Sequence, residues 1–112
     1  MGFPAGDLDR RIRIERQVRG EDSPGGEETY TWALVSIVWA NVRPLRGREL
    51  FAAQQVAAKV DTRFRIRWRT GITPERMRIV DDQGRGYDIM AVLEIGRRDG
   101  LEIMGVARAE EP

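Results

Sequence analysis

A strict two-residue alternation between residues 60 and 69 constrains the fold of this chain more than any other feature. The even positions hold bulky or β-branched side chains, namely Val60, Thr62, Phe64, Ile66 and Trp68. The odd positions hold charged side chains, namely Asp61, Arg63, Arg65, Arg67 and Arg69. Because successive side chains of a β-strand point to opposite faces of a sheet, the pattern predicts a strand with one buried face.

Five more segments have the composition or the alternation of strands. They span residues 10–18, 29–42, 77–80, 87–95 and 101–109. In the segment 29–42 we expect a kink or break near residues 33–36, and we expect Trp32 and Trp39 to be buried. Pro44 ends this segment, because proline cannot donate to a sheet.

The segment 87–95 is apolar on both sides. One face is formed by Tyr87, Ile89, Ala91, Leu93 and Ile95, and the opposite face carries Met90 and Val92 beside Asp88 and Glu94. A strand that is apolar on both sides is typically covered on both sides. One cover is the interior of the fold. The other is either a helix of the same chain or a neighbouring subunit.

One helix is expected, over residues 48–58. Leu50, Ala53 and Ala57 form an apolar stripe, and Glu49 lies in the first turn, where it favours the helix dipole. About three turns are marginal without packing. The excursion 44–58 that contains this helix is either a functional element or a lid that plugs one barrel end with Leu50 and Phe51.

Gly-rich or polar segments separate these elements and predict turns at residues 20–28, 70–76, 81–86 and 96–100. Within the second turn, Thr73 is a candidate cap for one helical turn that starts at Pro74. The sum predicts an all-β fold: a small β-barrel of about six strands with one short α-helix in an excursion between strands. We expect a single domain, residues 1–112, with a flexible arm at 1–9 and a frayed tail at 110–112.

The composition argues against catalysis and against strong nucleic-acid binding. The chain has 19 Lys and Arg against 18 Asp and Glu, a net charge of +1, and it contains neither His nor Cys. This excludes His-based acid–base chemistry, thiol nucleophiles and thiolate metal sites. We therefore expect no enzyme, no cofactor and no metal, and we interpret Asp81 and Asp82 as solvated carboxylates.

Four arginines, Arg63, Arg65, Arg67 and Arg69, share one face of the alternating segment and repel one another. One reading is a cross-strand ladder with carboxylates such as Glu15, Asp88, Glu94 or Glu102. The other is a contact with an acidic partner or with phosphate, which makes the four arginines candidate subunit-interface charges. The near-neutral balance favours a protein partner over DNA.

No targeting segment is visible, and the longest mostly apolar run, residues 29–42, is too short and too polar to cross a bilayer as a helix. We expect a protein that remains in the cytoplasm or enters a particle assembled there, without a membrane partner.

Several segments, taken together and in this order, resemble the phage head–tail joining family, also called head-closure or stopper proteins. They are RRIRI at 10–14, TW at 31–32, VWANV at 38–42, LRGRE at 45–49, AAQQ at 52–55, FRIRWR at 64–69, GIT at 71–73 and YDI at 87–89. The resemblance covers residues 6–108. Such proteins occur in siphophages, prophages and gene transfer agents.

The resemblance implies a dodecameric ring below the connector or adaptor on the portal, at the virion neck, assembled in the cytoplasm of a bacterial host. Such a ring closes the DNA channel after packaging and gives a tail terminator or tail-joining protein a docking surface, while double-stranded DNA passes without sequence-specific contact. The isolated subunit is compatible with a monomer. By the same resemblance, the excursion supplies candidate channel or ring contacts, namely Arg46, Arg48, Glu49, Gln54 and Gln55.

The alternative function is that of a small-barrel nucleic-acid-binding protein that grips a strand with Arg63, Arg65, Arg67 and Arg69. Tight, salt-sensitive binding by the isolated chain would distinguish it from a joining protein. A hydrolase that works through carboxylates is a third and weaker hypothesis, because the sequence alone establishes no paired geometry.

Overall fold

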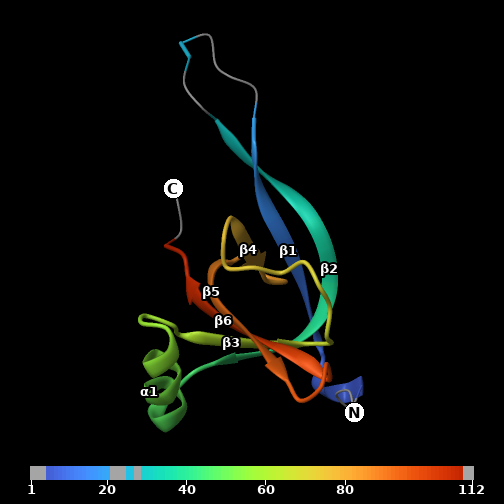
Figure 1. Cartoon of the computed structure of the whole chain (residues 1–112), viewed down its shortest axis with the longest axis vertical. Coiled ribbons are helices and arrows are strands. Elements are labelled where there is room, and N and C mark those ends of the chain that lie inside the picture. The colour runs from blue at the N-terminus through green and yellow to red at the C-terminus, as the bar shows by residue number, and fades with distance from the viewer. Residues whose placement is uncertain (1–4, 21–24, 27–28, 110–112) are drawn as a thin grey trace.

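The computed structural model describes residues 5–20, 25–26 and 29–109 of the chain (Figure 1). Six strands and one α-helix follow a short 3-10 helix in this part of the chain. In chain order the elements are η1 (Ala5–Asp7), β1 (Arg10–Arg19), β2 (Tyr30–Pro44), α1 (Gly47–Val56), β3 (Thr62–Ile66), β4 (Met77–Val80), β5 (Gly86–Ile95) and β6 (Gly100–Ala107).

The strands form a closed barrel in the order β1-β2-β3-β6-β5-β4, and every neighbouring pair is antiparallel. Pairing of β1 with β4 closes the barrel, with Ile14 opposite Ile79. Closure removes the unpaired edges that an open sheet of this size would expose. The predicted all-β barrel with one helix is confirmed.

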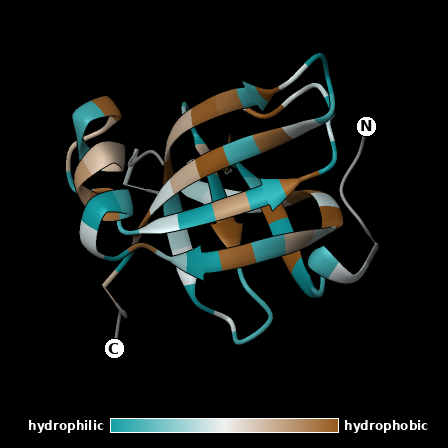
Figure 2. Ribbon diagram, turned by 90° about the horizontal axis from the view of Figure 1, so that it is seen from below, coloured by the Kyte–Doolittle hydropathy of each residue, from teal (hydrophilic) through white to brown (hydrophobic). Residues whose placement is uncertain are grey.

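The core consists of the inward-facing side chains of all six strands. Figure 2 shows apolar and hydrophilic positions alternating along the strands. Phe64 is fully buried at the centre and meets Tyr87 edge-on, with ring centroids 4.9 Å apart. The alternation that begins at residue 60 is confirmed through Ile66. Trp68 is only half-buried, because β3 ends before it.

β2 is one continuous strand that carries an irregularity where the sequence predicts one. Its register against β1 shifts so that Ser36 pairs with Ile14 and Leu34 with Glu15, which leaves Val35 as the extra residue of a β-bulge.

The expected burial of the two tryptophans of β2 is wrong for Trp39 and is met only in part by Trp32. Trp39 is 52% exposed, because Val38 packs on the core and Ala40 is buried, so the side chain between them faces outward. Trp32 is half-buried, because it lies where β1 and β2 run past the end of the barrel.

A second bulge, in β5, changes which side chains point inward. The pairing with β6 shifts between Ile89 and Ala91, so that Met90 is the extra residue. Val92 therefore packs on the main core, and Leu93 is 37% exposed. The prediction of one apolar face from Tyr87 to Ile95 is wrong beyond the bulge, because an extra residue inverts the two-residue period.

β1 and β2 extend beyond the barrel as a two-stranded ribbon (Figure 1). The last β1 residue that pairs with β4 is Arg16, whereas pairing with β2 continues to Arg19 and Tyr30. The described residues are accordingly elongated, 51 × 26 × 25 Å. Most of the predicted loop at 20–28 lies outside the described residues, which include only 20, 25 and 26 of it.

The remaining differences from the sequence prediction concern the ends of elements. α1 ends at Val56, so Ala57 caps it, and β6 ends at Ala107. No helical turn follows Thr73, whose N–H instead lies 3.3 Å from the sulfur of Met77.

Of the expected arm at 1–9 and tail at 110–112, residues 1–4 and 110–112 lie outside the described part. Leu8 is 6% exposed and buries its side chain.

Replacing Phe64 by alanine is expected to lower the free energy of unfolding by about 3–5 kcal/mol, because the change removes a fully buried ring and leaves a cavity. Phe51→Ala is the matched control: its ring is 70% exposed, and the expected loss is under about 0.5 kcal/mol. Urea unfolding followed by circular dichroism measures both. Equal losses for the two variants would contradict the assignment of the barrel interior.

Candidate functional site

The excursion between β2 and β3 is attached to the barrel along one narrow side. Its buried contacts form a small cluster separate from the main core, consisting of Leu45, Ala53, Val60 and Met104. Backbone hydrogen bonds from Leu45 N to Asp61 O and from Asp61 N to Gly105 O fix both ends of the excursion. Figure 1 shows α1 at one side of the molecule, next to one end of β3.

Three side chains continue this attachment. The amide of Gln54 donates to the carbonyl of Val60 across 3.2 Å. The carboxylate of Asp61 accepts hydrogen bonds from Ala107 N and from the hydroxyl of Thr62. Gly47 has φ of +55° where the chain enters α1, a conformation that glycine adopts without strain. The excursion is thus a well-defined appendage.

The predicted contact residues of the excursion all lie on its exposed side. Arg46, Arg48, Glu49 and Gln55 are exposed, and none of their side chains forms a hydrogen bond or ion pair within the described residues. Gln54 differs, because its amide bonds to the backbone of the same excursion.

The lid hypothesis for the excursion is wrong for Phe51, which is 70% exposed, whereas Leu50 is half-buried against the small cluster. Val56 is 58% exposed on the same helix. Of the apolar side chains of α1, Ala53 is therefore buried, whereas the large side chains of Phe51 and Val56 lie in solvent. Their exposure could not be predicted from the sequence, because apolar residues in a short helix normally indicate the buried face.

The arginine row is divided into two halves. Arg65 pairs with Glu102 on β6 across 3.1 Å, and Arg63 lies 3.9 Å from the same carboxylate. One of the predicted cross-strand carboxylates thus neutralises part of the row. Arg63 is 11% exposed in its side chain, and within the described residues its Nε has no hydrogen-bond partner. Burial lowers the pKa of Arg63 below its usual value, with Arg65 adding to the effect.

Arg67 and Arg69 lie beyond the end of β3, so the predicted row of four on one strand is wrong for this half. They flank a cavity of about 320 Å³ that Val38, Trp39 and Trp68 line with mostly apolar surface. Arg11 lies over the ring of Trp39 and Arg98 over that of Trp68, at 5.4 and 4.8 Å. With Leu34 and Ile37, Trp39 forms an exposed apolar strip on β2, here called the β2 outer face.

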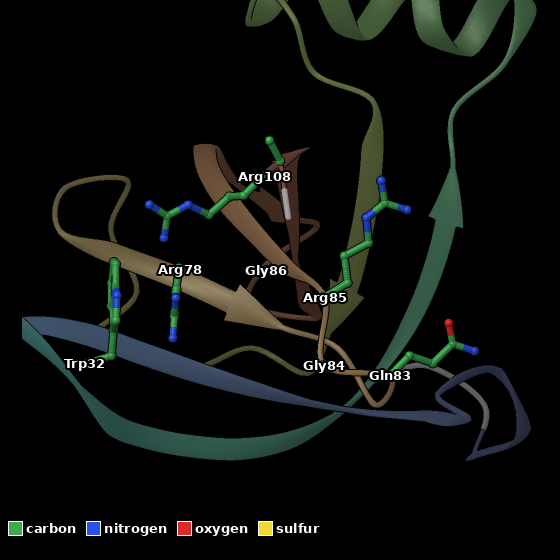
Figure 3. A pocket seen from close by; sticks show the side chains of 8 residues that line it. Trp32, Arg78, Gln83, Gly84, Arg85, Gly86 and Arg108 are labelled. Atoms are coloured by element: carbon green, nitrogen blue, oxygen red, sulfur yellow. The ribbon is translucent and has the colours of Figure 1, made fainter. Parts of the chain in front are cut away.

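A cavity of about 510 Å³ lies at the base of the β1–β2 ribbon (Figure 3). Its charged walls are Arg78 on β4, Arg85 in the turn before β5, and Arg108 after β6. Trp32 on β2 stands beside them, with the guanidinium of Arg78 4.2 Å and that of Arg108 5.5 Å from its ring centroid. We call this site the Trp32–Arg pocket. The sequence could not indicate it, because its side chains come from β2, from β4 and the turn that follows it, and from the segment after β6.

The interpretation of Asp81 and Asp82 as solvated carboxylates is wrong for Asp81. Asp81 is buried and accepts hydrogen bonds from Gln83 N and Arg85 N, both at 2.9 Å, and from the hydroxyl of Tyr87 at 3.0 Å. Asp82 pairs with Arg10. Across the described residues, no three His, Cys, Asp or Glu side chains are grouped to hold a metal ion. No helix in this part of the chain is long and apolar enough to cross a bilayer.

The family model described as phage head completion protein matches residues 3–108. The chain belongs to this family. The barrel is also similar to the solution structure of protein SF1141 from Shigella flexneri 2a, with a TM-score of 0.71 and 28% identity over 97% of this chain and 100% of that one. No curated protein matches.

The family suggested by the sequence segments is therefore confirmed. Phage head completion proteins are structural components of the virion rather than enzymes, and the family assigns this chain a structural role in joining head and tail.

Glu102→Gln is expected to lower the free energy of unfolding by about 1–3 kcal/mol, because it leaves Arg63 and Arg65 without their shared carboxylate. Glu94→Gln is the control. It keeps an oxygen that accepts from the indole N–H of Trp68, and the expected change is within about 0.5 kcal/mol. If urea unfolding gave the two variants the same midpoint, Glu102 would not neutralise the row.

The raised pKa of Tyr87 leads us to expect that the free energy of unfolding falls in alkali. Burial, together with the hydrogen bond to Asp81, raises the pKa of Tyr87 above its usual value of about 10. Below pH 10 the tyrosine is protonated in both states and its stabilisation is complete. As the pH rises above 10, the unfolded chain ionises first and the free energy of unfolding falls.

Urea unfolding between pH 8 and pH 11 measures this effect. Tyr87→Phe is expected to weaken the alkaline decline, and Tyr30→Phe, at a 52% exposed position, is expected to retain it. A decline of the same size in all three proteins would contradict the assignment to Tyr87.

Proposed function

We propose that this chain is the subunit of a head–tail joining ring at the virion neck. The ring docks below the portal or its adaptor, closes the DNA channel after packaging and presents the surface to which the tail attaches. The proposed partners are further copies of the chain, the adaptor, and a tail terminator or tail-joining protein. In this proposal the ring is dodecameric, forms on the adaptor, and is built in the host cytoplasm.

The family match across residues 3–108 supports this role. The structural support comes from the excursion. The barrel is closed without α1, so the excursion is not needed to complete the sheet. It is nevertheless held in one place by buried apolar contacts and backbone hydrogen bonds. A fixed appendage with unpaired polar side chains is suited to line or close a channel, and Arg46, Arg48, Glu49 and Gln55 are its proposed contacts.

A ring also requires two different surfaces on each subunit, which meet head to tail around a closed rotation. Two such surfaces lie beyond the two ends of β3. The helix α1 comes before its first residue, Thr62, and the cavity beside Trp68 comes after its last residue, Ile66. The β2 outer face adjoins that cavity through Trp39. Exposed aromatic side chains bordered by arginines are typical of protein interfaces. Arg67 and Arg69 are therefore the stronger interface charges of the row.

Charge also supports a role as a channel component. Duplex DNA must pass the ring without being held, and electrostatic affinity for DNA grows with the number of phosphates that a protein neutralises. A subunit with a net charge of +1 offers little such surplus.

The alternative nucleic-acid-binding function has less support. Glu102 neutralises Arg63 and Arg65, and Arg67 and Arg69 border an apolar cavity. A gel shift with the isolated chain tests this alternative. Tight binding that weakens steeply with salt would favour the alternative over the joining ring.

Arg48→Glu tests the proposed role of the excursion. The side chain is exposed and unpaired, so the variant is expected to fold with an unchanged melting temperature. Particles that carry it are expected to lose packaged DNA or to fail in tail joining, because the charge on the channel-lining helix is reversed. Counts of filled and tailed particles by electron microscopy give the result.

Arg97→Glu provides the control, since Arg97 is an exposed arginine in the turn between β5 and β6. Particles with this change are expected to be normal. Normal filling and tailing of Arg48→Glu particles would show that the excursion is not the channel element.

A further inference from the structure

The Trp32–Arg pocket has the chemistry of a receptor for carboxylates. Three arginines line it, and no Asp or Glu among the described residues does. Arg78 pairs with Glu15 across 2.7 Å and Arg108 with Asp88 across 3.3 Å, both outside the lining. Arg85 has no ion pair among the described residues, and its guanidinium lies only against the ring of Tyr87, at 6.0 Å.

Two of the three arginines, Arg78 and Arg108, are held in position before any ligand arrives. The nearly buried carboxylate of Glu15, which lies outside the lining of the pocket, forms ion pairs with both Arg13 and Arg78. It therefore holds the guanidinium of Arg78 in place. Trp32 lies within cation–π distance of both Arg78 and Arg108. Such preorganisation reduces the side-chain entropy that these arginines would lose when a ligand binds. The indole also gives the pocket an apolar wall, and a cavity of about 510 Å³ has room for several side chains. These features favour an acidic peptide segment over a single small anion.

The chain itself contains a segment of matching charge. Residues 20–28, which join β1 to β2, contain Glu21, Asp22, Glu27 and Glu28 and no Lys or Arg. The ribbon that carries this segment extends away from the barrel (Figure 1), and the pocket lies at its base, because Trp32 is part of β2. The pairs from Gln17–Trp32 to Arg19–Tyr30 lie between the pocket and the points where this segment joins the ribbon of the same chain.

A second copy is therefore the fitting source of the acidic segment. We infer that the acidic end of the β1–β2 ribbon of one copy inserts its carboxylates into the Trp32–Arg pocket of a neighbouring copy. The contact joins two different surfaces and is therefore of the head-to-tail kind that closes rings. It also accounts for the length of the ribbon, since a two-stranded ribbon has little stability of its own in water. The inference rests on the proposed ring and names one of its contacts.

Disulfide trapping tests the contact directly, because the chain has no cysteine of its own. The double variant Gly25→Cys/Gln83→Cys places one thiol near the acidic segment and one in the lining of the pocket. Gly25 is exposed with open space around it, and Gln83 is exposed, with only its backbone N–H bound to Asp81. A disulfide requires the two Cα atoms to approach within about 7 Å.

Oxidation of the double variant in assembled particles is expected to give a ladder of covalent dimers, trimers and higher oligomers. Each single-cysteine variant can give dimers at most. Adding Arg85→Glu is expected to lower the yield of the ladder by about tenfold or more, because like charges oppose each other across a contact. Adding Arg97→Glu, which makes the same charge change outside the pocket, is expected to leave the yield unchanged.

Two results would overturn the inference while the proposed function stands. One is a ring visible by electron microscopy whose double variant gives no ladder. The other is a monomer closed by an internal disulfide, which would place the acidic segment in the pocket of its own chain. Particles whose necks contain none of this chain would instead overturn the proposed function, and the inference with it.

Discussion

The pairing of β1 with β4 is the constraint on which the rest of the structure depends. Residues Arg13–Arg16 meet Met77–Val80 along this seam, and without it the six strands would form an open sheet with two exposed edges. The seam also holds the nearly buried carboxylate of Glu15 between Arg13 and Arg78. Closure gives every strand of the barrel two neighbours, so that the ribbon, where β1 and β2 pair only with each other, is the most open part of the sheet. Contacts with other chains are therefore expected at the parts that lie outside the barrel, namely the ribbon, α1 and the β2 outer face.

The alternation of apolar and charged residues made the strands predictable, because burial on one face imposes a two-residue period. Bulges are different, since the extra residue at Val35 or Met90 depends on the register of the partner strand. The period alone therefore assigned Leu93 to the wrong face. The exposure of Trp39 has the same origin: composition indicated a large apolar residue, but the positions of Val38 and Ala40 decided its direction.

The candidate sites also differ in whether their residues are close together in the sequence. The excursion and the first half of the arginine row are local in sequence, so their positions could be predicted. The Trp32–Arg pocket brings together side chains up to 76 positions apart, from residue 32 to residue 108, and only the closed barrel makes them neighbours. The partner of Arg63 and Arg65 could be narrowed to a few carboxylates, but choosing Glu102 required the β3–β6 register.

The account treats the chain as a passive ring component whose small barrel is a rigid support for contact surfaces. Its most direct test is the number and position of copies in purified particles, from quantitative mass spectrometry relative to the portal together with a cryo-electron microscopy map of the neck. The account predicts a single ring of this chain below the portal, with a copy number equal to that of a dodecameric portal. Tailed, DNA-filled particles with a complete neck and none of this chain would contradict it.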